Sequence, residues 1–126
     1  MALILIADDD DRGREAYAMI LRLCGYDVVT AAEGEAALRV LRERPVDLVL
    51  LDLAMPETCG QQVLRAMKAN PTLRDTPVLV ISALPEPVAA ARISQMGAAG
   101  LMIKSRFSKR DLVGRIEHLL ARPAVA

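Results

Sequence analysis

Short runs of consecutive apolar residues alternate along this chain with longer stretches in which apolar residues recur at helical spacing. Gly, Pro or Asp stands at many of the boundaries between them. A short run that is apolar at every position is typical of a strand buried on both faces of a sheet. An amphipathic stretch after it is typical of a helix that crosses over to the next parallel strand. The pattern therefore indicates an α/β fold built from repeated strand–helix units.

The pattern predicts five such units in one domain. The expected strands are 3–7, 27–31, 48–51, 78–81 and 101–103. The expected helices are 12–24, 35–44, 61–69, 86–96 and 109–121. The first helix should pack through Ala16, Met19, Ile20 and Leu23 and end at Gly25. The domain should span residues 1–121 and leave 122–126 as a loose tail.

The charge balance, the cysteines and the N-terminal apolar run indicate where the protein acts and which partners it lacks. Lys plus Arg and Asp plus Glu both total 16, so no basic excess favours direct binding to nucleic acid. Cys24 and Cys59 are far apart and lack the neighbours of a metal site, which favours free thiols and a cytoplasmic location. The apolar run 2–7 is too short for a membrane span and has no basic region before it. We therefore expect a cytoplasmic protein without membrane or nucleic-acid contacts of its own.

Polar side chains stand where four of the five predicted strands end. Asp8 and Asp9 follow the first strand, Asp52 the third, Ser82 the fourth and Lys104 the fifth. If the second strand lies outermost, a parallel sheet in the order 2-1-3-4-5 places these four ends side by side. Because doubly wound sheets bind ligands beyond the carboxyl ends of their strands, we expect one polar site there.

Four segments that contain these residues resemble the receiver domain of bacterial response regulators, the phosphoacceptor module of two-component signalling. They read ILIADDD, LVLLDLAMPETCG, VLVISA and GAAGLMIK, and they occur in the order and at the separations of that family. The resemblance covers nearly the whole chain. It implies a flavodoxin-like, doubly wound (βα)5 fold with a five-stranded parallel sheet in the order 2-1-3-4-5 and helices on both faces.

The resemblance also implies a magnesium site. Carboxylates that are held close together stay ionised only if a cation joins them, and Mg²⁺ prefers oxygen ligands in a small set. By resemblance, Asp9 and Asp52 ligate Mg²⁺ directly with the backbone carbonyl of Ala54, and Asp8 acts through bound water.

The implied activity is phosphoryl transfer to the protein itself. Asp52 would accept the phosphoryl group of a phosphohistidine, while the ammonium of Lys104 and the hydroxyl of Ser82 would contact the phosphoryl oxygens. Such a chain catalyses its own phosphorylation and dephosphorylation and is no conventional enzyme. Its partners would be a histidine kinase or histidine phosphotransfer protein and an effector protein. It would be a monomer or a phosphorylation-dependent dimer.

The remaining polar residues near these motifs receive simpler interpretations. Asp11 is expected to cap the next helix, and Asp10 to be solvated. His118, on the last predicted helix, is expected at the surface rather than in the site.

Three departures from the family pattern bear on switching. Receivers usually carry a proline after the lysine, joined by a cis peptide bond, whereas Ser105 follows Lys104 here, and we expect a trans bond. The switch position that often holds Tyr or Phe is Leu101. The two positions that tune hydrolysis are Ala54 and Leu84, neither of which can orient water, so a long-lived phosphoryl group is expected.

Other interpretations stay open. A pseudo-receiver would keep the fold as an interaction module without phosphorylation. The chain could also be the receiver part of a larger regulator or hybrid kinase. A haloacid-dehalogenase-like phosphohydrolase expects a D-x-D-x-T element, but positions 8–12 read DDDDR, and Asp52 would have no role.

Overall fold

The structure is a computed structural model that describes residues 2–53, 60–94, 96–104 and 106–121. Strands and helices alternate through this part of the chain, as predicted. The strands are β1 (Leu3–Ala7), β2 (Asp27–Ala31), β3 (Leu48–Asp52), β4 (Val78–Ser82) and β5 (Gly100–Ile103). The helices are α1 (Asp11–Leu23), α2 (Gly34–Glu43), α3 (Gly60–Ala69), α4 (Glu86–Ile93) and α5 (Lys109–Ala121). The largest boundary difference is in α4, which ends three residues before the predicted end at 96.

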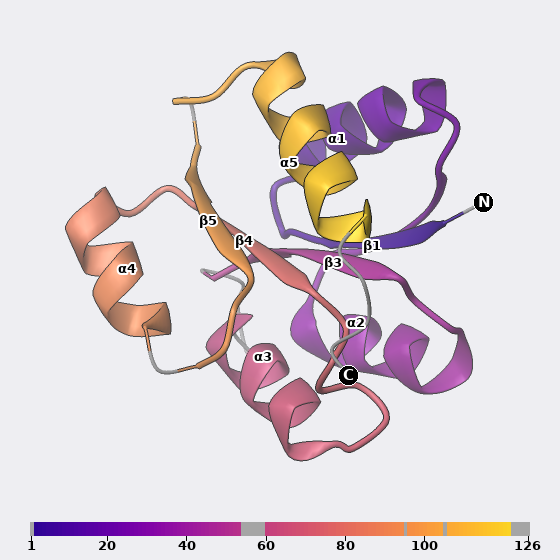
Figure 1. The fold of residues 1–126 in the computed structure, drawn as a ribbon, viewed down its shortest axis with the longest axis vertical. Helices are drawn as coiled ribbons and strands as arrows, with labels where there is room; N and C mark the ends of the chain where they lie inside the picture. The colour runs from indigo at the N-terminus through magenta and orange to yellow at the C-terminus, as the bar shows by residue number, and fades with distance from the viewer. Residues whose placement is uncertain (1, 54–59, 95, 105, 122–126) are drawn as a thin grey trace.

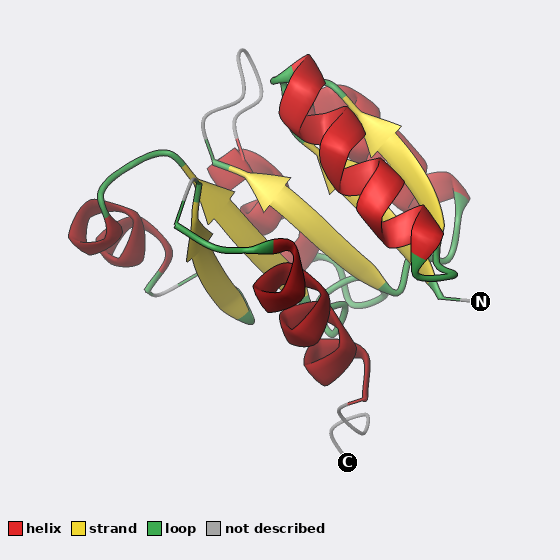
Figure 2. Ribbon diagram, turned by 90° about the horizontal axis from the view of Figure 1, so that it is seen from above, coloured by secondary structure: helices red, strands yellow, loops and turns green. Residues whose placement is uncertain are grey.

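The strands form one parallel sheet in the order β2-β1-β3-β4-β5, as the sequence predicted. Helices α1 and α5 cover one face of the sheet, and α2 and α3 cover the other (Figure 1). The view in Figure 2 shows the sheet between these helical layers. The fold is therefore a doubly wound, flavodoxin-like (βα)5 fold.

Side chains of successive residues in the central strands pack into two separate cores, one on each face of the sheet. In β1, Leu5 packs with α2 and α3, whereas Ile4 and Ile6 pack with α1 and α5. All three side chains are buried. Because both faces are covered, these strands are apolar at every position, which is why they read as continuous runs in the sequence.

The prediction of the buried face of α1 was wrong. Met19 and Leu23 are 65% and 82% exposed, whereas Ala18 and Leu21 are fully buried. Apolar residues lie on two adjoining faces of this helix, so periodicity alone could not choose between them. The helix packs through the face that carries the small Ala18. The helix ends one residue earlier than predicted, with Cys24 rather than Gly25 as its C-cap, and Gly25 follows the cap with a φ of 94°.

The start of α1 also differs from the prediction. Asp10, not Asp11, occupies the N-cap position, and its side chain makes no capping hydrogen bond. Asp11 is the first residue of the helix, and its carboxylate pairs with the guanidinium of Arg14 at 2.5 Å. Asp10 is exposed, as expected. A negative charge in the first turn still interacts favourably with the helix dipole.

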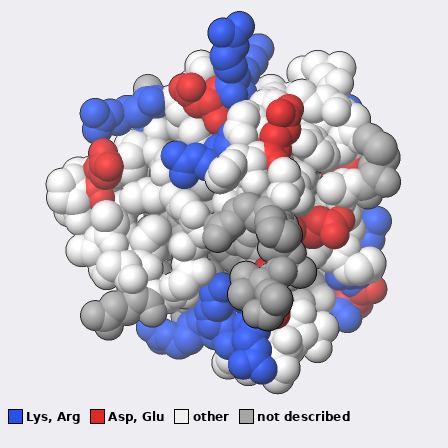
Figure 3. All heavy atoms as spheres, in the orientation of Figure 1, with Lys and Arg blue, Asp and Glu red and all other residues white. Residues whose placement is uncertain are grey.

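The surface carries both signs of charge. Acidic and basic side chains are both spread over the face shown in Figure 3. His118 of α5 is exposed, as predicted, and so is Cys24, which is a free thiol. None of the helices in the described residues has the length and apolar character needed to cross a bilayer.

Candidate functional site

The carboxyl ends of four strands bring the predicted site residues together. Asp8 follows β1, Asp52 ends β3, Ser82 ends β4 and Lys104 follows β5. The register of the sheet sets these ends at nearly the same level, because Asp52 pairs with Ile81 and the next residue, Ser82, pairs with Ile103. The polar groups therefore converge at one edge, as expected for a doubly wound sheet.

Three aspartates form a compact cluster. One carboxylate oxygen from each of Asp8, Asp9 and Asp52 lies within 4.8 Å of the other two. Asp8 and Asp52 are 2% and 4% exposed, whereas Asp9 is exposed to solvent. An all-oxygen donor set that is partly open to water suits Mg²⁺, which keeps several waters when it binds to proteins. The described residues therefore fit a magnesium ion held by these three carboxylates.

Lys104 brings an ammonium group to the same cluster. Its Nζ lies 3.2 Å from Oδ2 of Asp8 and 3.6 Å from Oδ2 of Asp52. Burial lowers the pKa of Lys104, but the negative charges of Asp52 and Asp8 outweigh it, so the pKa is raised above its usual value. Its backbone N–H donates to the carbonyl of Ser82 at 2.8 Å. The lysine is thus charged at neutral pH and held at the site.

The charges at the site do not cancel among themselves. The formal charges of Asp8, Asp9 and Asp52 total three negative charges against the one positive charge of Lys104, which leaves two negative charges. One divalent cation would balance them. This balance is an argument for a magnesium site that is independent of ligand geometry.

Ser82 is buried beside this cluster and is only 1% exposed. Its Oγ accepts a hydrogen bond from the backbone N–H of Leu84 at 3.0 Å, so the hydroxyl proton remains available for another acceptor. The side chains of Leu84 and Leu101 are half-buried and pack against the core on the α2–α3 face. The predicted role of the Ala54 carbonyl and the predicted trans bond before Ser105 lie outside the described residues.

Hydrogen bonds hold the loop after β1 in place. The Asp10 N–H donates to Oδ1 of Asp8 at 2.9 Å, and the guanidinium of Arg14 donates to the carbonyl of Asp8 at 2.9 Å. Arg14 therefore links Asp11 to the loop that carries Asp8. The sequence pattern gave no signal for this arginine.

Two other residues near the site were not assigned a role from the sequence. Tyr17 of α1 borders, together with Asp8 and Asp52, a gap in the packing that is too small to admit water. Gly60 begins α3, and a Cβ on it would overlap the backbone carbonyl of Asp52. Only glycine therefore fits against the strand end that carries Asp52. A glycine within the DLAMPETCG motif was the available signal for this close approach.

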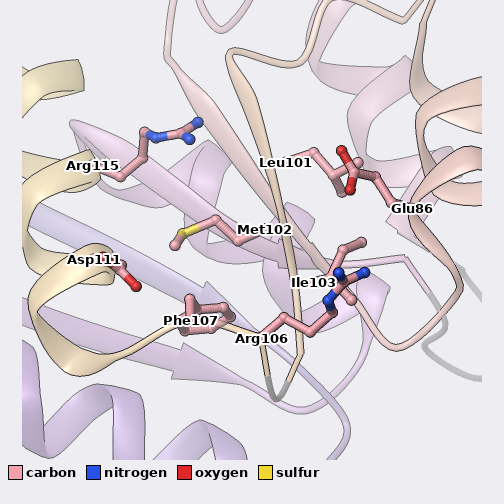
Figure 4. Close-up of a pocket in the computed structure, with 8 residues that line it drawn as sticks. All are labelled: Glu86, Leu101, Met102, Ile103, Arg106, Phe107, Asp111 and Arg115. Atoms are coloured by element: carbon pink, nitrogen blue, oxygen red, sulfur yellow. The ribbon is translucent and has the colours of Figure 1, made fainter.

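A separate groove of about 460 Å³ lies along the edge strand β5. Leu101 and Ile103 lie on one side of the strand, and Met102 lies on the other side with Phe107 and Arg115 (Figure 4). None of the three clustered aspartates lines it. The groove is therefore separate from the acidic site.

Residues 4–117 match the family model described as the response regulator receiver domain. The chain belongs to this family. It is 35% identical over 119 residues to the response regulator RR06 of Streptococcus pneumoniae, covering 94% of this chain and 53% of that protein. The first curated relatives are covered over 45–53% of their length, so the chain spans about half of each.

Solved structures of receivers have the same fold. A putative response regulator from Chloroflexus aurantiacus superposes with a TM-score of 0.90 at 30% identity, over 96% of this chain and 98% of that one. The response regulator TrrA from Thermotoga maritima, solved in complex with Mg²⁺ and BeF, gives a TM-score of 0.83 at 28% identity, over 94% and 99% of the two chains. This receiver therefore shares both sequence and architecture with its family.

Proposed function

We propose that this receiver accepts a phosphoryl group from a phosphohistidine donor onto Asp52 and that the change alters its interaction with an effector protein. The observation that carries the proposal is the buried carboxylate of Asp52 beside both a carboxylate cluster suited to Mg²⁺ and the ammonium of Lys104. Phosphoryl transfer needs mainly positioning and charge neutralisation, and these residues supply both.

In the proposed reaction, a carboxylate oxygen of Asp52 attacks phosphorus and forms an O–P bond. The P–N bond of the phosphohistidine breaks, and its electron pair stays on the histidine nitrogen. Mg²⁺, held directly by Asp9, Asp52 and the Ala54 carbonyl and by Asp8 through water, would neutralise phosphoryl charge when bound. The Lys104 ammonium lies 3.6 Å from Asp52 and would neutralise charge on the phosphoryl oxygens from the other side.

Ser82 would respond to the new phosphoryl group. Its hydroxyl is buried at the end of the neighbouring strand, with a proton that no other contact in the described residues uses. Donation of that proton to a phosphoryl oxygen would compete with the present turn between Ser82 and Leu84. Movement of this turn would carry a local charge change to the surface around β4 and β5.

The proposed partners are a histidine kinase or a histidine phosphotransfer protein as donor, and an effector protein as target. The relatives RR06 and the PhoB protein of Pseudomonas aeruginosa are regulators about twice the length of this chain. We propose action in the cytoplasm, where histidine kinases present their phosphohistidine. Direct nucleic-acid binding by these residues is not part of the proposal.

The proposal is tested by incubating the protein with Mg²⁺ and acetyl phosphate and measuring its mass. We expect a gain of one phosphoryl group that Asp52→Asn abolishes and that chelation of Mg²⁺ prevents. Absence of an adduct would instead identify a pseudo-receiver. Continuous turnover of unrelated phosphoesters would identify a phosphohydrolase.

A further inference from the structure

The segment between β5 and α5 carries Lys104, and the chain lacks the proline that usually constrains this segment. Besides the ion pairs of Lys104 and the hydrogen bonds between Ser108 and Asp111, three contacts hold the described part of it. The Lys104 N–H donates to the Ser82 carbonyl at 2.8 Å, and the Arg106 N–H donates to the Ile103 carbonyl at 3.0 Å. The third contact is aromatic, because the ring of Phe107 stacks on the ring of Tyr17 from α1.

The stacked pair joins two elements that are distant in the sequence. The centroids of the two rings lie 6.2 Å apart, and the ring planes make an angle of 30°. Both rings pack against the core on the α1–α5 face, and both are half-buried. Stacked aromatic pairs at this distance attract each other beyond simple burial of their area. The contact therefore joins the segment after Lys104 to helix α1.

Tyr17 also lies next to the acidic site. It borders the same small packing gap as Asp8 and Asp52. Burial raises the pKa of Tyr17, the Lys104 charge opposes this, and the charges of Asp8, Asp10 and Asp52 add to it. The phenol is therefore neutral and lies within electrostatic range of the groups that would carry out phosphoryl transfer.

We propose that Tyr17 is a positioning residue for Lys104. Its ring holds Phe107, and Phe107 holds the segment that sets the Nζ of Lys104 beside Asp8 and Asp52. The stacked rings thus supply a constraint that the sequence lacks at Ser105. This inference rests on the proposed phosphorylation of Asp52. It concerns the ring of Tyr17 rather than its hydroxyl, because the contact with Phe107 is made by the ring.

The test measures the rate at which acetyl phosphate and Mg²⁺ phosphorylate the full chain. We expect Tyr17→Leu and Phe107→Leu each to slow the reaction by between about threefold and 100-fold, since misplacement by 1 Å can cost on the order of 100-fold. The double variant should be no slower than the slower single variant, because both substitutions remove the same contact. Tyr17→Phe should react at the wild-type rate.

Further measurements separate positioning from a general loss of structure. Mg²⁺ affinity, measured by calorimetry, should be unchanged in Tyr17→Leu, because the three carboxylates keep their places. Tyr26→Leu is the matched control, since Tyr26 packs against the same core without a contact to Phe107, and it should react normally. If Tyr17→Leu does not fold, Phe107→Leu alone decides the question.

Three results would overturn the inference while leaving the proposed function standing. They are a wild-type rate in Phe107→Leu, multiplicative effects in the double variant, and a slow Tyr17→Phe variant. A wild-type protein that gains no phosphoryl group would instead refute the proposed function.

Discussion

Replacement of Asp9 by asparagine isolates the electrostatic cost of the acidic cluster. Asp9 is exposed, and its side chain makes no hydrogen bond or ion pair within the described residues, so Asp9→Asn removes one charge with almost no change in shape. Its oxygen lies within 4.8 Å of oxygens of Asp8 and Asp52. At that distance, two like charges repel by about 0.9 kcal/mol in water and by about 3.5 kcal/mol at an effective dielectric constant of 20.

The expected effect lies at the lower end of this range, because Asp9 is exposed and Lys104 offsets part of the repulsion. Without Mg²⁺, Asp9→Asn should raise the free energy of unfolding by about 1 kcal/mol. With Mg²⁺ at about 100 times its Kd, the wild type should gain about 2.7 kcal/mol and the variant much less, so that the order of stability reverses. Urea unfolding, with and without the ion, measures both differences.

A matched control is Asp75→Asn. Asp75 is also exposed but lies before β4, at the opposite ends of the strands, so its substitution should change neither stability nor the response to Mg²⁺. If Asp9→Asn is less stable than the wild type without Mg²⁺, repulsion among the carboxylates does not govern the site. An equal gain from Mg²⁺ in both proteins would show that Asp9 is not a ligand.

Four further predictions concern other parts of the molecule. Leu21→Ala should cost about 2–5 kcal/mol in urea unfolding, whereas Leu23→Ala should stay within about 0.5 kcal/mol, and the reverse order would refute the buried face of α1. Gly60→Ala should cost about 1–3 kcal/mol and slow phosphorylation, because the new methyl group displaces the Asp52 backbone; a normal variant in both assays would contradict this close contact. Leu84→Glu should shorten the lifetime of the phosphoryl group, measured by mass spectrometry after the donor is removed, and a faster-decaying wild type would refute the role of the apolar side chain. Hydrogen bonds from Ser108 lower the pKa of Asp111 below 3.8, so its stabilising contribution is present above that value and is lost as the pH falls through the lowered pKa. The stability difference between wild type and Asp111→Asn should therefore shrink in acid, and a constant difference down to the lowest pH would argue against these hydrogen bonds.

The order of the strands and the ends at which the polar residues meet were predictable from the sequence. Strands such as β1 and β3 are buried on both faces, so each reads as an unbroken apolar run, and the parallel arrangement follows from that burial. The positions of Asp8, Asp52, Ser82 and Lys104 then follow from topology, because each comes at or directly after a strand end.

The contacts that hold the site in place were less predictable. The face of α1 was misjudged because Met19 and Leu23 are as apolar as the residues that are buried, and only packing against the sheet separates them. The stacking of Tyr17 on Phe107 joins positions that no local pattern relates. Such contacts depend on how elements meet in space, which a single sequence does not encode in any spacing.

The ring of Phe107 has two neighbours of different kinds. It stacks on Tyr17 at the acidic site, and it also lines the groove along β5 (Figure 4). A molecule that binds in the groove and shifts this ring would also shift the position of the segment after Lys104. Because such coupling is reciprocal, phosphorylation of Asp52 would change the affinity of that molecule for the groove. The factor would equal the one by which the bound molecule changes the equilibrium constant for phosphorylation. One aromatic side chain would thus make the groove and the acidic site of this receiver energetically dependent on each other.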